Sequence, residues 1–267
     1  MPTVRVNDTE IYYESHGAEE NPTIVFAHGR GGNTLSWWQQ VSFFSEQYRC
    51  IAFDQRGWGR SPANDISRSR EYFAYDLASL LDYLKIDETF LVSQSMGGFS
   101  CLGFALNHPN RTCGLVLGDT TGGVATVGTL SELKKTNPPP DGPARSLSQS
   151  FIKNNPGKAF LYQQINDLNP PRGDDGIVSG FRREDGPNCE SFSHWDIPTL
   201  LIVGEEDVIF PPSVIAEVQK SIPGSRMEIV TGAAHSVHFE KPAVFNRLVD
   251  DMFSSIVNKP ILSGPIK

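Results

Sequence analysis

The sequence predicts an α/β fold in which helices flank a mostly parallel, eight-stranded sheet and a mainly helical cap is inserted in the chain. Three observations predict this fold. From Thr23 onward short apolar strands alternate with longer helical stretches, one strand runs into a tight turn and a helix at Ser95, and the alternation lapses once, after Asp119. Strands that alternate with helices form βαβ units, which assemble into parallel sheets.

Eight strands are expected. Residues 3–6 and 11–16 flank the turn-forming pair Asn7-Asp8, a pattern that is typical of an antiparallel hairpin. The other strands are predicted at residues 23–29, 49–54, 89–94, 114–119, 199–207 and 227–232. Helices are predicted at residues 35–47, 70–86 and 96–108, and after the prolines at positions 212 and 242.

The stretch from residue 120 to residue 193 lacks this strand rhythm. It contains the proline run "NPPPDGP", a helical segment at residues 158–166 and the loop-forming sequence "NPPRGDDG". A loop of this length without secondary structure is improbable in a compact domain. We therefore interpret residues 120–193 as a cap that shapes a substrate pocket, and residues 1–119 with 194–267 as the core. The tail, residues 258–267, is expected to be poorly ordered.

Composition and charge exclude several classes of protein. The formal net charge of −8, with no dense run of Lys and Arg, argues against a nucleic-acid partner, which needs clustered cations. No segment reaches the roughly 18 apolar residues of a membrane-spanning helix, so no membrane partner is expected. The opening "MPTVRVNDTE" does not resemble a secretion signal, which favours a cytoplasmic location. A small neutral or hydrophobic partner fits best, and the oligomeric state is not predicted.

Neither a metal nor a cofactor is predicted. The histidines are scattered and none shows the His-x-x-x-His spacing with a nearby glutamate. The cysteines also lack a Cys-x-x-Cys pair; they are Cys50, Cys101, Cys113 and Cys189. Reduced thiols are therefore favoured over disulfides.

The segment "LVSQSMGGFS", residues 91–100, places three serines at the end of an apolar strand. A serine hydroxyl becomes a nucleophile when a base, usually a histidine oriented by a carboxylate, removes its proton. Ser95 lies on the turn between the strand and the next helix, and Gly97 lets that helix pass close to the strand. Ser93 lies inside the strand and Ser100 inside the helix. Ser95 is therefore the predicted nucleophile.

Five short motifs follow one another in the order of a known family. They are "FAHGRGG", "FDQRGWGRS", "SQSMGG", "VGEEDVIFPP" and "GAAHSVHFEKPAVFN". With them the chain resembles the α/β-hydrolase family over nearly its whole length, in particular the esterase and lactonase branch with an inserted cap. It departs from the family pattern at Ser93, which stands where the Gly-x-Ser-x-Gly turn has its first glycine.

The resemblance implies a set of site residues. It makes Ser95 the nucleophile, His235 the base and Asp207 the acid that orients the base. It also implies an oxyanion hole formed by the backbone N–H groups of Arg30 and Met96. The implied activity is that of a serine hydrolase, which cleaves a carboxylic ester or lactone through an acyl-enzyme and needs no cofactor.

Other residues are alternatives for two of these roles. Asp119, at the end of a strand, is an alternative acid, and His238 is an alternative base. His28 and the Asp54–Arg56 pair are instead expected to make hydrogen bonds that stabilise their loops.

The substrate pocket is expected to be apolar or aromatic, although aromatic residues are more often part of a core. Trp37 is a predicted substrate-binding residue because it lies near the catalytic edge of the sheet. The Arg30 side chain is the second predicted substrate-binding group. It could pair with a substrate carboxylate, face solvent or pair with an aspartate of the cap. Two other functions stay open, namely carbon–carbon bond hydrolysis of dienoic diketones and a slow-turnover ligand receptor with the same fold.

Overall fold

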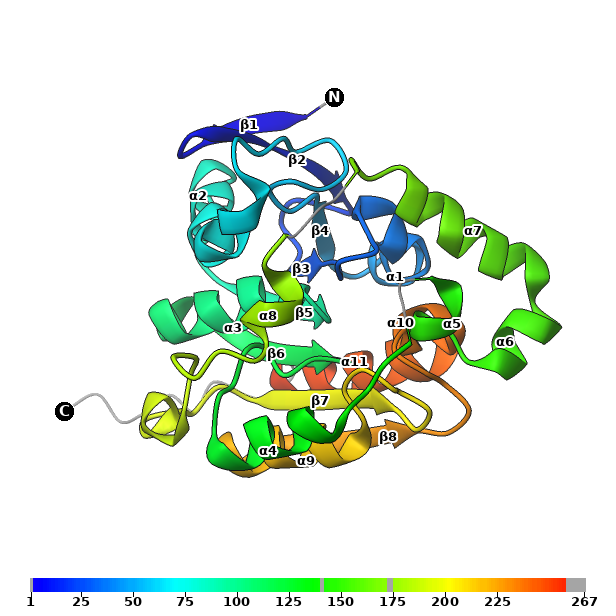
Figure 1. Cartoon of the computed structure of the whole chain (residues 1–267). Coiled ribbons are helices and arrows are strands. Elements are labelled where there is room, and N and C mark those ends of the chain that lie inside the picture. Colours follow the sequence, from blue (N-terminus) through cyan, green and yellow to red (C-terminus); the bar gives the residue numbers. More distant parts are fainter. Residues whose placement is uncertain (1, 140–141, 172–174, 258–267) are drawn as a thin grey trace.

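The computed structural model describes residues 2–139, 142–171 and 175–257. Its centre is a sheet of eight strands in the order β1-β2-β4-β3-β5-β6-β7-β8 (Figure 1). β1 (Thr3–Val6) pairs antiparallel with β2 (Thr9–His16), which pairs antiparallel with β4 (Arg49–Phe53). From β4 to β8 all neighbours are parallel. The predicted mostly parallel, eight-stranded sheet is confirmed, and the predicted disorder of residues 258–267 lies outside the described residues.

The inner strands are short apolar runs that are buried on both faces. They are β4, β3 (Thr23–Ala27), β5 (Thr89–Gln94), β6 (Thr112–Gly118) and β7 (Thr199–Gly204). The edge strand β8 (Arg226–Val230) is largely exposed or half-buried. Successive side chains of a strand point to opposite faces. In β3, Val25 therefore joins one hydrophobic cluster and Phe26 the other, and both are fully buried.

Helices cover both faces of the sheet. The flanking helices are α1 (Trp38–Phe44), α2 (Phe73–Tyr83), α3 (Gly97–Asn107), α9 (Pro212–Ser221) and α11 (Pro242–Val257). Apolar residues of α2, α3 and α9 pack into the cluster on one face, and those of α1 and α11 pack into the cluster on the other face. Short 3-10 helices at Thr34–Trp37, Ile66–Tyr72 and Pro109–Arg111 join these elements.

The regular secondary structure that the structure describes between β6 and β7 is helical, and turns and loops join its helices. Its helices are α4 (Val127–Lys135), α5 (Pro143–Ser146), α6 (Gln149–Asn154), α7 (Pro156–Asp167) and α8 (Ile177–Gly180), followed by a 3-10 helix at Cys189–Phe192. Figure 1 shows α5, α6 and α7 beside α10 (Val237–Glu240). A small separate cluster joins them, in which Phe151 of α6 and Ile165 of α7 are buried with Phe239 of α10.

The strand order brings the catalytic loops together. β3 lies between β4 and β5, so the chain leaves β3 toward one side of the sheet and later returns on the other side. At such a reversal the loops after the carboxyl ends of the parallel strands diverge and leave a crevice, where ligands bind in open α/β sheets. The loops that follow β3, β5, β7 and β8 carry the predicted site residues.

Helix α3 approaches β3 so closely that one of its positions has no room for a side chain. A Cβ atom on Gly97 would lie 2.0 Å from the carbonyl oxygen of Ala27 and 3.0 Å from the Cβ of Ala27. Because the oxygen belongs to the backbone of a central strand, it cannot rotate away as a side chain would. This contact fixes the distance between the helix and the sheet at the point where β5 ends.

We expect the substitution Gly97→Ala to lower the free energy of unfolding by at least about 2 kcal/mol, because α3 must move off the sheet. The matched control is Gly157→Ala in α7, where a Cβ would meet nothing within 4 Å. That change should leave the free energy unchanged or raise it by up to about 1 kcal/mol, because Ala favours helix more than Gly does. Urea unfolding measures both variants, and equal midpoints would contradict the close approach.

Candidate functional site

Ser95 lies on a strained turn between β5 and α3. Its φ of +49° is in the left-handed region, which costs a non-glycine residue about 1–2 kcal/mol. Backbone contacts hold the turn: Ser95 N–H donates to the Gly118 carbonyl at 3.0 Å, and Thr120 Oγ1 donates to the Ser95 carbonyl at 2.6 Å. Strain of this kind persists where the surroundings enforce it, as at catalytic turns.

The structure brings Ser95, His235 and Asp207 together from three different loops. His235 Nε2 lies 2.9 Å from Ser95 Oγ, and His235 Nδ1 lies 2.8 Å from Asp207 Oδ2. The other oxygen of Asp207 accepts the backbone N–H groups of Ile209 at 2.8 Å and Phe210 at 3.0 Å. Since a carboxylate only accepts hydrogen bonds, Nδ1 carries the imidazole proton and Nε2 is left to accept the hydroxyl proton.

The surroundings of His235 favour its protonated form. Burial opposes the charged imidazolium, but the negative charge of Asp207 and the hydrogen bond to it outweigh burial and raise the pKa of His235. Asp119 adds to this rise and Arg145 opposes it. The imidazole is therefore a stronger base than an isolated histidine.

The loop after β3 passes directly against the serine turn. A Cβ atom on Gly29 would lie 1.9 Å from Oε1 of Gln94 and 3.2 Å from the Cβ of Ser95. Trp58 Nε1 donates to the carbonyl oxygen of Arg30 at 2.7 Å, which fixes the orientation of the peptide group between Arg30 and Gly31. The loop that contains Arg30 therefore lies beside Ser95, and Met96 follows Ser95 at the start of α3.

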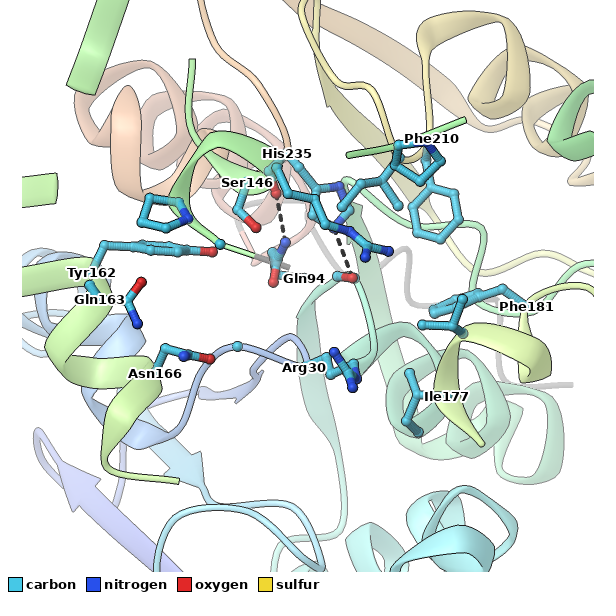
Figure 2. A pocket seen from close by; sticks show the side chains of 18 of the residues that line it. Arg30, Gln94, Ser146, Tyr162, Gln163, Asn166, Ile177, Phe181, Phe210 and His235 are labelled. Atoms are coloured by element: carbon cyan, nitrogen blue, oxygen red, sulfur yellow. Dashed lines mark hydrogen bonds between the residues drawn. The ribbon is translucent and has the colours of Figure 1, made fainter. Parts of the chain in front are cut away.

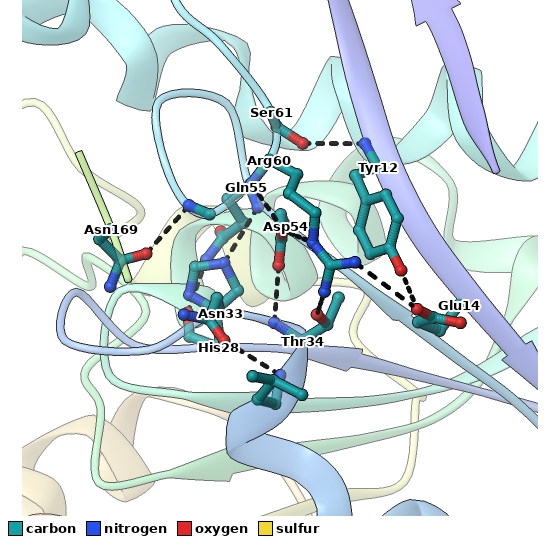
Figure 3. Close-up of polar contacts among 12 residues, drawn as sticks. Tyr12, Glu14, His28, Asn33, Thr34, Asp54, Gln55, Arg60, Ser61 and Asn169 are labelled. Atoms are coloured by element: carbon teal, nitrogen blue, oxygen red, sulfur yellow. Dashed lines mark hydrogen bonds and ion pairs between the residues drawn. The ribbon is translucent and has the colours of Figure 1, made fainter. Parts of the chain in front are cut away.

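A polar network behind this loop holds it to the loop after β4 (Figure 3). Asp54 accepts the N–H groups of Thr34 at 2.6 Å and Arg60 at 2.8 Å, and Gln55 N–H donates to His28 Nε2 at 3.0 Å. His28 and Asp54 therefore stabilise their loops, as expected. Arg56 does so too, but its partners are Asp8 and Asp76 rather than Asp54.

Asp119, the alternative acid, and His238, the alternative base, do not lie where those roles would need them. Asp119 is fully buried and accepts the N–H groups of Gly204 and Val237, both at 3.0 Å. Burial and the charge of Asp207 raise the pKa of Asp119. The ring of His238 packs on Trp37 with centroids 4.7 Å apart, and burial lowers the pKa of His238 to about 3. Both residues therefore support the loops behind the site.

Ser95 and His235 line a cavity of about 150 Å³, drawn in Figure 2. Trp37 is not among the lining residues: it is fully buried in the core against Phe26 and Phe245. The prediction that Trp37 binds substrate is therefore wrong, because the helix that carries it turns the indole inward.

The Arg30 side chain lines the cavity and pairs with a carboxylate of the expected cap. Its Nε lies 2.5 Å from Oδ2 of Asp175, whose side chain is 3% exposed. Of the three partners considered from the sequence, the cap aspartate is the one observed.

Several lining residues were not singled out from the sequence as polar groups of the pocket. Gln94 donates from Nε2 to the His235 carbonyl at 2.7 Å, and Tyr162 shares a hydrogen bond of 3.0 Å with Ser236. Gln94 stands inside the serine motif and could have been noticed there. Arg145, in α5, also lines the pocket, but nothing in the local sequence marks it as a pocket residue because its segment has no periodic pattern.

Within residues 2–139, 142–171 and 175–257, no helix is long and apolar enough to cross a bilayer. The same residues contain no group of three or more His, Cys, Asp or Glu that could hold a metal ion. The four cysteines are free thiols.

The electrostatics of the site can be tested by titrating the histidines with NMR. We expect the pKa of His235 to lie above the ordinary value of 6.5, and Asp207→Asn to lower it by about one pH unit or more because the imidazolium loses its counter-charge. His238 is the internal control, since it should stay neutral throughout a titration from pH 9 to about pH 5. A His235 that titrates below 6.5 in the wild type would contradict the described contacts.

The proteins to which this chain is similar agree with the geometry of the site. A family model for the alpha/beta hydrolase fold matches residues 22–141 and 124–242. A Bacillus subtilis protein provisionally named as a 2-succinyl-6-hydroxy-2,4-cyclohexadiene-1-carboxylate synthase is 31% identical over 90% of this chain and 93% of its own length. A 2-hydroxy-6-oxononadienedioate/2-hydroxy-6-oxononatrienedioate hydrolase from Cupriavidus pinatubonensis is 28% identical over 95% of this chain and 94% of its own length.

Among solved structures, the enol-lactonase from Burkholderia xenovorans LB400 has the same fold. Its TM-score is 0.78 at 22% identity, and the match covers 95% of this chain and all of the other. The family model, the relatives and the fold agree with the resemblance found in the motifs. The chain belongs to the α/β-hydrolase family.

Proposed function

We propose that the protein is a serine hydrolase that cleaves a carboxylic ester or lactone of a small substrate. The observation that carries this proposal is the hydrogen-bonded chain from Ser95 through His235 to Asp207 at the edge of a pocket. A hydroxyl, an imidazole and a carboxylate in this order are what nucleophilic acyl transfer needs. Similarity to an enol-lactonase and a dienedioate hydrolase supports hydrolysis of this general kind.

The reaction follows from the direction of the hydrogen bonds. His235 Nε2 takes the proton of Ser95 Oγ as that oxygen attacks the substrate carbonyl carbon, and then gives the proton to the leaving alcohol oxygen. This leaves an acyl group on Ser95. His235 next takes a proton from water, whose oxygen attacks the acyl carbon, and returns that proton to Ser95 as the acid leaves. Asp207 stays ionised and stabilises the imidazolium.

The backbone N–H groups of Arg30 and Met96 are the proposed donors to the oxyanion. Met96 follows the nucleophile, and Arg30 lies in the loop that passes against Gln94 and Ser95. Donors that are fixed before the reaction stabilise the developing charge, and one such donor is worth about 3 kcal/mol. Two contacts on either side of the Arg30 N–H support this rigidity: the close packing of Gly29 before it, and the hydrogen bond from Trp58 to the Arg30 carbonyl after it.

Residues 120–193 are proposed to act as a cap on the core formed by residues 1–119 and 194–267. Tyr162 in α7 and Phe181 after α8 line the cavity with Ser95, so a substrate would lie between the cap and the sheet. Exclusion of water from that space would strengthen the electrostatic contacts of the site. The expected cytoplasmic location stays a prediction.

The nucleophile can be identified by labelling with a fluorophosphonate, which reacts with activated serines. We expect one label per chain on Ser95, and no label and no ester turnover in Ser95→Ala, because the Ser95 hydroxyl is the one that contacts His235. The control Ser93→Ala loses only a hydrogen bond of 3.0 Å to the Val116 carbonyl and should keep both the label and the turnover. Labelling of Ser95→Ala, or its undiminished turnover, would rule out this mechanism.

The oxyanion loop can be loosened without touching any reacting group. We expect Trp58→Phe to lower kcat about ten- to a hundredfold with a smaller change in KM, because the Arg30–Gly31 peptide group loses the hydrogen bond that holds it and the adjoining Arg30 N–H is then held less firmly. Trp195→Phe is the matched control: its indole donates to Thr199 Oγ1 at 3.0 Å, remote from the cavity-lining residues, and kcat should change less than about twofold. Equal effects of the two changes would argue against a positioned oxyanion donor.

Carbon–carbon bond hydrolysis of a dienoic diketone is the second candidate, favoured by the similarity to the dienedioate hydrolase. The same three side chains serve both reactions, so a substrate panel must decide. If kcat/KM for a 2-hydroxy-6-oxodienoate exceeds that for every ester and lactone tested, the second candidate replaces the first. The slow-turnover receptor would instead show a labelled Ser95 and an acyl-enzyme that persists for hours.

A further inference from the structure

The Arg30 N–H, a proposed oxyanion donor, belongs to a tight turn in the loop after β3. The N–H of Gly32 donates to the carbonyl of Gly29 at 2.9 Å, which closes a four-residue turn over residues 29–32. Arg30 and Gly31 are the two central residues of this turn, and both line the pocket. A short turn that is closed by its own hydrogen bond moves as a unit, so a contact that fixes the Arg30 side chain also restrains the Arg30 N–H.

The Arg30 side chain is tied to the segment between β6 and β7 by one buried carboxylate. Its Nε donates to Asp175 Oδ2 at 2.5 Å (Figure 2 shows Arg30 at the edge of the pocket). The other oxygen of Asp175 accepts the N–H of Ile177 at 3.0 Å, at the start of α8. Charge-assisted hydrogen bonds are the strong ones, and low local dielectric strengthens them further. Asp175 therefore holds the turn against α8.

Two buried asparagines hold the turn and the residue after it from the side of α7. Asn33 donates from Nδ2 to the Ile165 carbonyl at 2.9 Å. Asn169 accepts the Gly59 N–H at 2.9 Å and donates from Nδ2 to the Gly31 carbonyl at 3.4 Å. Buried amides that have found partners are costly to displace. The segment between β6 and β7 therefore grips the turn at more than one point.

The ion pair also bears on what the Arg30 cation is used for. Asp175 balances the charge of the guanidinium, so a substrate carboxylate would compete with Asp175 for it. Recognition of substrate by Arg30 and positioning of the turn therefore predict opposite effects when Asp175 loses its charge. Recognition predicts faster turnover of anionic esters, whereas positioning predicts slower turnover of every ester.

We propose that Asp175 is a positioning residue for the oxyanion hole: it holds the Arg30 side chain, and with it the turn that presents the Arg30 N–H to the substrate carbonyl oxygen. Asp175 is not among the described residues that line the pocket, so it acts through Arg30. The inference rests on the proposed function, since the oxyanion arises only when Ser95 attacks a carbonyl. It makes the segment between β6 and β7 a determinant of rate as well as of pocket shape.

Removal of the charge of Asp175 tests the proposal. We expect Asp175→Asn to lower kcat for p-nitrophenyl butyrate about ten- to a hundredfold, with KM within about threefold, because the Arg30 N–H stabilises the transition state more than the bound ester. The rate at which a fluorophosphonate labels Ser95 should fall by a similar factor, since the phosphoryl oxygen needs the same donors.

Asp185→Asn is the matched control. Asp185 lies in the same segment and pairs with Arg183 at 2.8 Å, but both side chains are exposed and neither is among the described residues that line the pocket. Exposed ion pairs contribute little, so kcat and the labelling rate should change less than about twofold.

A double variant separates positioning from stability. Asp175→Asn alone leaves the Arg30 charge unbalanced and should lower the urea midpoint, whereas Arg30→Met combined with Asp175→Asn removes both charges. We expect the midpoint of the double variant to lie closer to that of the wild type, while its kcat and labelling rate stay at least about tenfold low. The double variant carries the test even where Asp175→Asn is too unstable to assay.

A kcat and a labelling rate of the double variant within about twofold of the wild type would overturn the proposal. So would an Asp175→Asn variant that hydrolyses mono-p-nitrophenyl glutarate at least about tenfold faster than the wild type, since Arg30 would then be a recognition group. In both cases Ser95 still takes the label, so the proposed function stands. If the wild type neither cleaves an ester nor takes a phosphonate on Ser95, the proposed function fails, and this proposal fails with it.

Discussion

The left-handed backbone of Ser95 is the constraint on which the rest of the site depends. It follows the end of β5 at Gln94, turns the hydroxyl toward His235 and lets α3 begin at Gly97, two residues later. The conformation is unfavourable in isolation, and it is held because Gly97 lets α3 lie against β3 and Gly29 lets the next loop lie against Gln94. A methyl group at Gly97 would push α3 away from the backbone of β3, and one at Gly29 would displace the Gln94 side chain beside the site.

The loop that carries His235 is held by the segment between β6 and β7 as well as by the sheet. Glu240 accepts the backbone N–H of Ala234 at 2.8 Å, one residue before His235, and also both the N–H and the hydroxyl of Ser148 in the cap segment. Burial raises the pKa of Glu240, and these hydrogen bonds oppose the rise. Because one buried carboxylate joins the two segments, a displacement of α6 would also displace the backbone next to His235.

The sequence predicted the parts of this protein that local geometry dictates. The inner strands were predictable because each is a short apolar run, and Ser95 because a strand, a turn and Gly97 leave few other residue types possible there. Trp37 was misassigned because an indole near the sheet edge gives the same sequence signal whether it faces the pocket or the core. Arg145 and Asp175 were not predictable as neighbours of the site. No local pattern marks them, because they reach the site through the folding of a segment that has no periodic pattern.

The central claim is that the turn at Ser95 places the nucleophile beside two fixed N–H donors. A crystal structure of the protein after reaction with a phosphonate tests it most directly, because the phosphoryl oxygen occupies the place of the oxyanion. We expect phosphorus on Ser95 Oγ, with that oxygen about 2.7–3.1 Å from the backbone nitrogens of Arg30 and Met96. An adduct on another residue, or a phosphoryl oxygen that contacts neither nitrogen, would contradict the account.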